Sequence, residues 1–113
     1  MFYHIFGSYG VDLNLKSDLP IFVWLQGGPG ASSQFGAFRE IGPILIKNSK
    51  YEYNSWSWNL FGHLLFVDSP LNVGFSYSNV SRDGQEQVSS TEMAANHLVN
   101  FLDNFFKTWD NLK

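Results

Sequence analysis

An apolar run that breaks into a glycine-rich segment is the feature that most constrains the fold of this chain. Residues 21–25 are continuously apolar, which predicts a strand buried on both faces of a parallel sheet. Residues 27–30 then read Gly-Gly-Pro-Gly. Glycine lets the backbone approach a ligand closely, so this loop can aim its N–H groups at a developing negative charge. A plain tight turn between a strand and a helix is the alternative interpretation.

The spacing of apolar segments predicts an α/β fold with an incomplete sheet. The predicted elements are strands at 2–6, 21–25 and 63–68, a short helix at about 32–39, a loop at 69–87 and a helix at 89–109. If strands 21–25 and 63–68 are parallel, they need a crossover connection, and the long segment between them provides one. Three strands of this kind make only part of a sheet, so we expect a single partial domain over residues 1–113.

The last predicted helix has the clearest pattern. Its large apolar side chains recur at three- and four-residue intervals, at Leu98, Phe101, Leu102, Phe105 and Trp109. Such a stripe predicts a face packed into the core. Ser89, followed three residues later by Glu92, predicts a capping box at the start of the helix.

Four sequence blocks in a fixed order resemble those of one protein family. They read WLQGGPGASS at 24–33, EIGP at 40–43, SWN at 57–59 and LFVDSPLNVGFSYS at 65–78. In order and spacing they are similar to the blocks of the serine carboxypeptidase family, which has the α/β-hydrolase fold. Gln26 stands where many members have Asn, and it resembles the vitellogenic-like and retinoid-inducible branches.

The resemblance implies an amino-terminal fragment of a longer protein. Residues 91–109 resemble the helix that precedes the family's GESYxG nucleophile elbow, and that elbow, with the Asp and His of the triad, would lie beyond residue 113. We therefore expect truncation at both ends. The 113 residues alone are expected to lack a triad and to be inactive.

The chemistry that the resemblance implies is removal of the last residue of a peptide by a serine nucleophile, with no cofactor. Gly28 would offer its backbone N–H to the oxyanion, and one such donor contributes about 3 kcal/mol. Gln26 and Gly27 would bind the substrate's terminal carboxylate together with Glu40. Two carboxylates in contact must share a proton, so binding would favour acid pH, unless Glu40 is simply a solvated charge at a helix end. We expect Asp68 to fix a turn.

Other serine-containing segments match a nucleophile elbow or triad less well. Ser76 lies in a near match to the G-x-S-x-G elbow, but no strand directly precedes it, and Ser8 lies in a similar near match before the glycine segment. Ser33, Asp68 and His97 occur in the order of a hydrolase triad, although order alone does not establish geometry. The three histidines share no short spacing typical of a metal site.

Composition favours a globular piece of a larger fold. Hydrophobic residues make up 44% and charged residues 15%, which excludes a disordered chain. A net charge of -3 offers no basic face for nucleic acid or an anionic membrane. Aromatic residues reach 18%, so in an isolated domain of this size some would face water. The expected partners are peptides or proteins with a free carboxyl end, and the resemblance allows a homodimer of the full-length parent.

The chain has no cysteine, so the sequence does not indicate whether the protein belongs to an oxidising or a reducing compartment. Family members often have a disulfide-bonded Cys where this chain has Ala31. Residues 1–10 do not resemble a signal peptide. Asn79 begins an Asn-Val-Ser glycosylation sequon. By resemblance, the full-length parent would be vacuolar, lysosomal or secreted.

Two alternatives remain open at the level of sequence. One is another α/β-hydrolase, such as a lipase or esterase, although an uncharged ester has no need of Gln26 and Glu40. The other is a non-catalytic module that binds peptide carboxyl ends or regulates a partner. For residues 1–113 in isolation we expect an aggregating or partly folded chain, because the sheet would expose an apolar edge.

Overall fold

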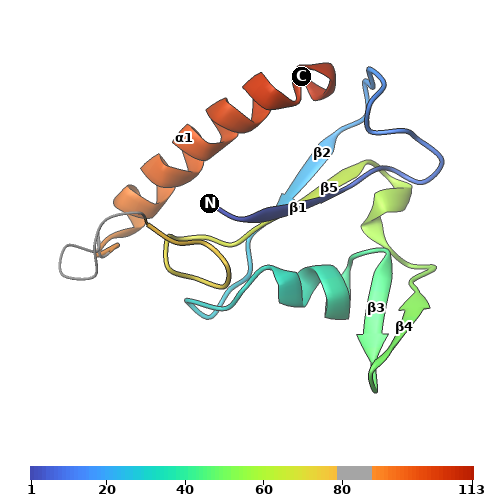
Figure 1. Cartoon of the computed structure of the whole chain (residues 1–113), viewed down its shortest axis with the longest axis horizontal. Coiled ribbons are helices and arrows are strands. Elements are labelled where there is room, and N and C mark those ends of the chain that lie inside the picture. The colour runs from blue at the N-terminus through green and yellow to red at the C-terminus, as the bar shows by residue number, and fades with distance from the viewer. Residues whose placement is uncertain (79–87) are drawn as a thin grey trace.

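A three-stranded sheet with its most apolar strand in the middle organises the chain (Figure 1). The structure is a computed structural model that describes residues 1–78 and 88–113. Strand β5 (His63–Val67) lies between β1 (Tyr3–Phe6), which is antiparallel to it, and β2 (Ile21–Trp24), which is parallel to it. The strands predicted at 2–6, 21–25 and 63–68 are confirmed, as is the parallel pairing of the last two.

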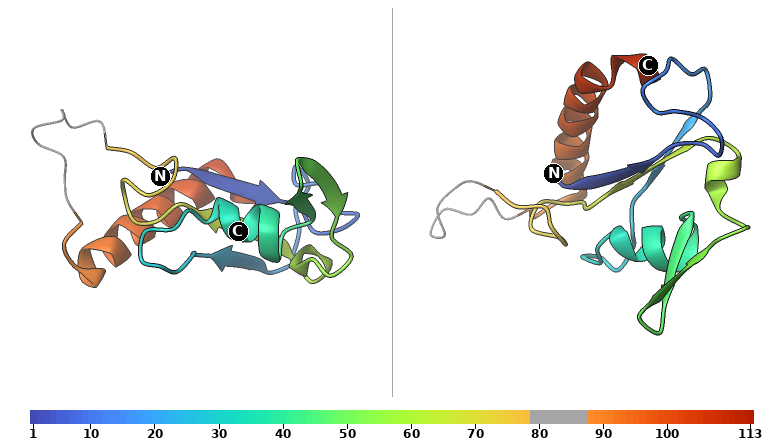
Figure 2. Two further views of the ribbon diagram at one scale, coloured as in Figure 1. Left: turned by 90° about the horizontal axis from the view of Figure 1, so that it is seen from below. Right: turned by 45° about the vertical axis from the view of Figure 1, so that its right-hand side comes forward.

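Strand β5 is buried on both faces because helical segments cover each side of the sheet. Successive side chains of a strand point to opposite faces. Leu65 and Val67 pack with Phe105, whereas Leu64 and Phe66 pack with Ala37 on the other side. Two small cores therefore share strand β5. The right-hand view of Figure 2 shows helical segments on both sides of the sheet.

The long helix α1 (Thr91–Thr108) covers the first face, and its predicted apolar stripe is confirmed. The predicted capping box is wrong by one residue. The Ser90 side chain accepts the N–H of Met93 at 3.1 Å, so Ser90 rather than Ser89 is the N-cap. Glu92 is then the second helical residue, where its charge still complements the helix dipole but cannot complete the box.

The short helix predicted at about 32–39 is confirmed on the second face of the sheet, where residues 34–40 are helical and the last five form the π-helical turn η1 (Gly36–Glu40). The segment begins where Phe35 and Ala37 donate their N–H groups to the carbonyls of Ser32 and Ser33, at 3.0 and 3.1 Å. The turn ends where Ile41 donates its N–H to the carbonyl of Gly36 at 3.0 Å. Pro43 follows two residues later and cannot extend the helical pattern.

A β-hairpin that the sequence did not predict projects beyond η1 (Figure 1). It consists of β3 (Ile44–Lys47) and β4 (Lys50–Tyr53), which pair antiparallel. Asn48 and Ser49 form the turn with φ of 50° and 60°, the conformation that two-residue hairpin turns require. The connection between the parallel strands is therefore this hairpin, η1 and the 3₁₀ turn η2 (Trp58–Leu60), not a single crossover helix.

The prediction that strand β2 is buried on both faces is wrong. Its residues are half-buried, and Val23 is 40% exposed. The reason is its place at the sheet edge, where β5 is its only neighbour among residues 1–78 and 88–113. The continuous apolar run suits an internal strand of a parallel sheet, and here one of its sides has no strand partner in the described part of the chain.

Exposed aromatic side chains are numerous, as the composition predicted. Those at least half exposed are Tyr9, Phe35, Tyr51, Tyr53, Trp56, Phe61, Phe75 and Tyr77. Scattered apolar residues are normal on a protein surface, but Tyr9 and Tyr53 also lie together, with ring centroids 6.4 Å apart. No helix in the described residues is both long and apolar enough to cross a membrane.

Burial of His63 at the start of β5 makes the stability of this fold depend on pH. His63 is fully buried, and its Nδ1 accepts the N–H of Ser8 at 3.1 Å. Its Nε2 has no hydrogen-bond partner among the described residues. Desolvation lowers the pKa of the imidazole below its usual 6.5, because a charge there would be buried.

We expect acid to destabilise the fold through His63. Below about pH 6.5 the His63 imidazole is protonated in the unfolded chain but stays neutral in the folded chain. The free energy of unfolding that is present above this pH is therefore lost as the pH falls towards the folded pKa. His63→Asn keeps an acceptor for Ser8 and should abolish this part of the loss. Urea midpoints of the protein that carries this chain, at about pH 7.5 and 5.5, test the prediction. An equal loss in the variant would contradict it.

Candidate active site

The loop that follows β2 is closed by a single serine hydroxyl. We call residues 26–33 the glycine loop. At its start, the Gln26 N–H donates to Ser33 Oγ at 3.0 Å. Ser33 Oγ in turn donates to the carbonyl of Val67 at 2.5 Å. The two ends of the loop and the end of β5 are thus joined at one atom.

Asp68 fixes the far end of the same loop. Its Oδ1 accepts the Ser32 hydroxyl and the Ser33 N–H, each at 2.7 Å. Its Oδ2 accepts the N–H of Phe75 at 2.9 Å. Asp68 is completely buried, and these three donors replace the water that its carboxylate loses. Our expectation that Asp68 fixes a turn is confirmed, and the residue holds two loops rather than one.

Gly28 has a backbone conformation that favours glycine. Its φ is 138°, and a Cβ there would lie 3.1 Å from the N of Ala31 and 3.2 Å from the N of Gly30. Neither Gly27 nor Gly28 donates its N–H to a backbone acceptor in the described parts of the chain. The loop therefore carries, on two exposed residues, adjacent N–H groups that no backbone carbonyl of the described residues accepts.

A hollow of about 640 Å³ lies against this loop. Its lining residues are Gln26, Gly27, Gly28, Ala31, Ser32, Gln34 and Phe35. The Gln26 Oε1 accepts the indole N–H of Trp24 at 2.8 Å, which orients the side-chain amide and leaves its Nε2 donors for another partner. The structure thus brings three of the predicted site residues, Gln26, Gly27 and Gly28, to one surface.

Glu40 lies apart from these three. It is the last residue of η1, it is exposed, and it does not line the hollow. Within residues 1–78 and 88–113 its carboxylate has no hydrogen bond and no ion pair, since Lys47 and Glu52 form the one ion pair there. Its predicted part in carboxylate binding stays a prediction.

The alternative nucleophiles are occupied by structural hydrogen bonds. The Ser76 hydroxyl accepts the N–H of Phe2 at 2.8 Å and donates to the Asp68 carbonyl at 2.5 Å. Ser33 and Asp68 do meet, but the Ser33 hydroxyl donates to the main chain. His97 belongs to α1, which packs on the face of the sheet opposite η1. The described residues therefore do not assemble a Ser-Asp-His triad.

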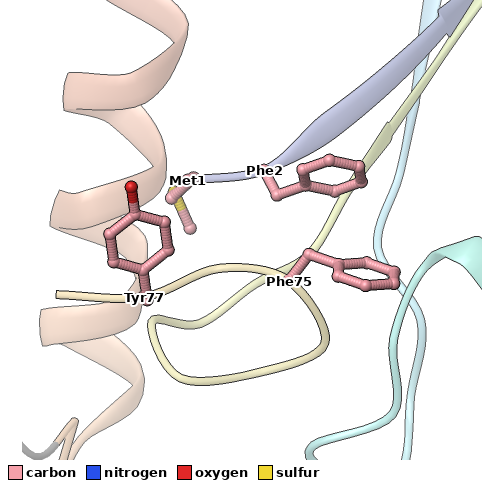
Figure 3. A pocket seen from close by; sticks show the side chains of 4 residues that line it. All are labelled: Met1, Phe2, Phe75 and Tyr77. Atoms are coloured by element: carbon pink, nitrogen blue, oxygen red, sulfur yellow. The ribbon is translucent and has the colours of Figure 1, made fainter.

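A second hollow, of about 320 Å³, lies between the start of the chain and the loop that follows β5 (Figure 3). It is lined by Met1, Phe2, Phe75 and Tyr77. Phe2 and Phe75 lie side by side, with ring centroids 5.0 Å apart. Among the residues described, no group of three or more His, Asp or Glu could hold a metal ion. Asn79 and its sequon lie outside the described residues.

Comparison with known proteins identifies the family. The sequence profile described as serine carboxypeptidase matches residues 1–113, the whole chain. The chain belongs to the serine carboxypeptidase family. The leaning towards its vitellogenic-like and retinoid-inducible branches stays a prediction.

Individual relatives agree with this assignment. The pheromone-processing carboxypeptidase kex1 of Aspergillus terreus is 48% identical over 85 residues, covering 74% of this chain and 13% of that protein. Serine carboxypeptidase-like 34 of Arabidopsis thaliana is 46% identical over 101 residues, 86% of this chain and 20% of that protein. The chain thus spans a fifth or less of these two curated relatives.

A solved structure also resembles the fold. It is that of Kex1(delta)p, a prohormone-processing carboxypeptidase from Saccharomyces cerevisiae, with a TM-score of 0.69 and 31% sequence identity. The match covers 93% of this chain and 27% of that one. The small mixed sheet described above therefore corresponds to part of a serine carboxypeptidase.

Sequence reasoning missed the role of Ser33. The residue lies in the WLQGGPGASS block, but we considered it only as a nucleophile. A pair of serines directly after a glycine-rich turn was an available signal, because Ser side chains commonly bond to nearby backbone groups. Its partners, Val67 and Asp68, are more than thirty residues away along the chain and could not be identified without the sheet pairing.

Close packing around Gly36, under the glycine loop, predicts that Gly36→Ala lowers the free energy of unfolding. A Cβ at Gly36 would lie 2.4 Å from the indole nitrogen of Trp24 and 3.0 Å from Gln26 Oε1. We expect a loss of about 1–3 kcal/mol in the free energy of unfolding, because both side chains must move. Gly27→Ala is the control, since nothing lies within 4 Å of its Cβ, and it should change stability by less than about 0.5 kcal/mol. Equal urea midpoints for the two variants would refute this.

Proposed function

We propose that this chain is the amino-terminal part of a serine-type carboxypeptidase with the α/β-hydrolase fold. In this proposal it supplies half of the oxyanion hole and the site for the substrate's terminal carboxylate. The observation that carries the proposal is the glycine loop, where Gln26, Gly27 and Gly28 line one hollow and Gly28 has a positive φ. The whole protein, several times longer than this chain, would supply the serine, aspartate and histidine.

Each residue then has a chemical role. The serine attacks the last peptide carbonyl, and the carbonyl oxygen gains negative charge as the tetrahedral intermediate forms. The Gly28 N–H would donate to that oxygen, together with a second donor from the residue after the nucleophile. Collapse of the intermediate breaks the C–N bond and releases the terminal amino acid, and water then hydrolyses the acyl-enzyme.

Recognition of the terminal carboxylate would make the enzyme an exopeptidase. The Gln26 amide and the Gly27 N–H are neutral donors suited to a carboxylate acceptor. The neighbouring wall is apolar, with Phe35 and Ala31 beside the donors. The substrates would be peptides or proteins with a free carboxyl end. The parent would reach a vacuole or lysosome or be secreted, and Asn79 would then be available for glycosylation.

The first test of this proposal compares matched peptides that end in a free carboxylate or in an amide. We expect the whole protein to release the last residue of the free peptide with a kcat/KM about 10- to 100-fold higher, because hydrogen bonds to a charged group are the stronger ones. Mass spectrometry of the products measures both rates. Hydrolysis of simple esters with no preference for a free carboxylate would instead support an esterase.

Glu40 gives the second test. If it shares a proton with the substrate's carboxylate, KM should rise by about tenfold or more from pH 5 to pH 8, as that proton becomes harder to retain. Glu40→Gln can donate a hydrogen bond without a shared proton, so its KM should change by less than about threefold over the same range. Glu52→Gln, on the exposed hairpin, is the matched control and should behave as the wild type. A Glu40→Gln profile that follows the wild type would exclude Glu40 from the carboxylate site.

A further inference from the structure

We propose that Ser33 and Asp68 are positioning residues that set the direction in which the Gly28 N–H points. This inference rests on the proposed function, since it assigns the two residues a part in forming the oxyanion hole. Neither side chain lines the hollow, so both would act through the main chain of the glycine loop.

The hydroxyl of Ser33 has both of its bonding functions in use. Its proton goes to the Val67 carbonyl, and one lone pair receives the Gln26 N–H. Ser33 is 1% exposed, so water cannot easily substitute for either bond. Because Gln26 lies two residues before Gly28, this hydroxyl fixes the path by which the chain leaves β2 and approaches the oxyanion position.

Asp68 fixes the opposite side of the loop. By accepting from the Ser32 hydroxyl and the Ser33 N–H, it holds the residues that follow the glycines. Gly28 therefore lies between two anchored points, and its φ of 138° is in the region that favours glycine. Strands β2 and β5 are parallel, so their carboxyl ends meet at one edge of the sheet, where ligands of α/β proteins bind.

The same carboxylate connects this loop to a second one. Asp68 Oδ2 accepts the N–H of Phe75, and a Cβ at Gly74 would lie only 2.2 Å from that oxygen. Residues 74 and 75 thus pack directly on the carboxylate. A shift of Asp68 would be transmitted to both loops at this edge.

A positioning role differs measurably from simple stabilisation. A residue that only stabilises the fold changes the number of folded molecules but not the kcat of each folded active site. A residue that aims the Gly28 N–H changes kcat per site, since a displacement of about 1 Å at a reacting group can cost 10²-fold. The decisive quantity is therefore kcat divided by the concentration of titrated active sites.

The chain offers a matched pair of serines for this test. Ser8 is also buried, and its hydroxyl donates to a backbone carbonyl, that of Asn59, at 3.0 Å. It has no contact with the glycine loop among the hydrogen bonds of the described residues. Ser33→Ala and Ser8→Ala each remove one buried hydroxyl, but only Ser33→Ala releases Gln26.

The experiment uses the whole protein and reads two signals. Active sites are counted by the end point of reaction with an organophosphonate, and peptide hydrolysis then gives kcat per site. We expect Ser33→Ala to lower kcat per site by about 10- to 100-fold, and Ser8→Ala by less than about twofold. Amide hydrogen exchange gives the second signal, and Ser33→Ala should speed exchange at Gln26 by about tenfold or more.

A second variant keeps the test decisive if Ser33→Ala does not fold. Asp68→Asn preserves shape, but its NH₂ must face at least one of the three donors that the carboxylate accepts, so we expect the same loss of kcat per site. Values of kcat per site equal to that of Ser8→Ala would overturn the proposal. If the wild type releases no terminal residue, the proposed function fails, and unchanged exchange at Gln26 in Ser33→Ala would separately overturn the positioning role.

Discussion

The buried carboxylate of Asp68 is the interaction on which the rest of this structure depends. It lies directly after β5, the strand shared by both small cores, and it receives three hydrogen bonds from two different loops. A carboxylate without partners at this depth would be strongly unfavourable, so the loops and the carboxylate require one another. The position of the glycine loop is thus tied to the best-packed strand of the chain.

In this arrangement, the residues that hold the loop differ from the residues that would supply its hydrogen-bond donors. The side chains of Ser33 and Asp68 are buried and hydrogen-bonded, whereas Gly27 and Gly28, in the loop that they hold, are exposed residues. Backbone donors that are fixed before a substrate arrives need no reorganisation when charge develops. In the proposed function this one short loop would supply such donors at two places, the oxyanion and the terminal carboxylate.

Local sequence patterns predicted the helices and strands better than they predicted the burial and the hydrogen-bond partners of those elements. The apolar stripe of α1 and the apolar runs of β2 and β5 identified those elements because periodicity depends on nearby residues alone. The hairpin was missed because Asn48-Ser49 lacks the Asn-Gly or Asp-Gly signal, although both residues adopt positive φ. Burial of β2 was overestimated because the sequence of a strand does not show which strands lie beside it. The motifs indicated Gln26, Gly27 and Gly28, but not the hydrogen bonds by which Ser33 and Asp68 hold the two ends of the glycine loop.

The most direct test of this account is a crystal structure of the whole protein with a phosphonate bound to its nucleophile. The phosphonyl oxygen stands in for the oxyanion of the tetrahedral intermediate. The account predicts the Gly28 nitrogen at about 2.7–3.1 Å from that oxygen, with the bonds of Ser33 and Asp68 unchanged. A phosphonyl oxygen held by other donors, with the Gly28 N–H turned away, would contradict it.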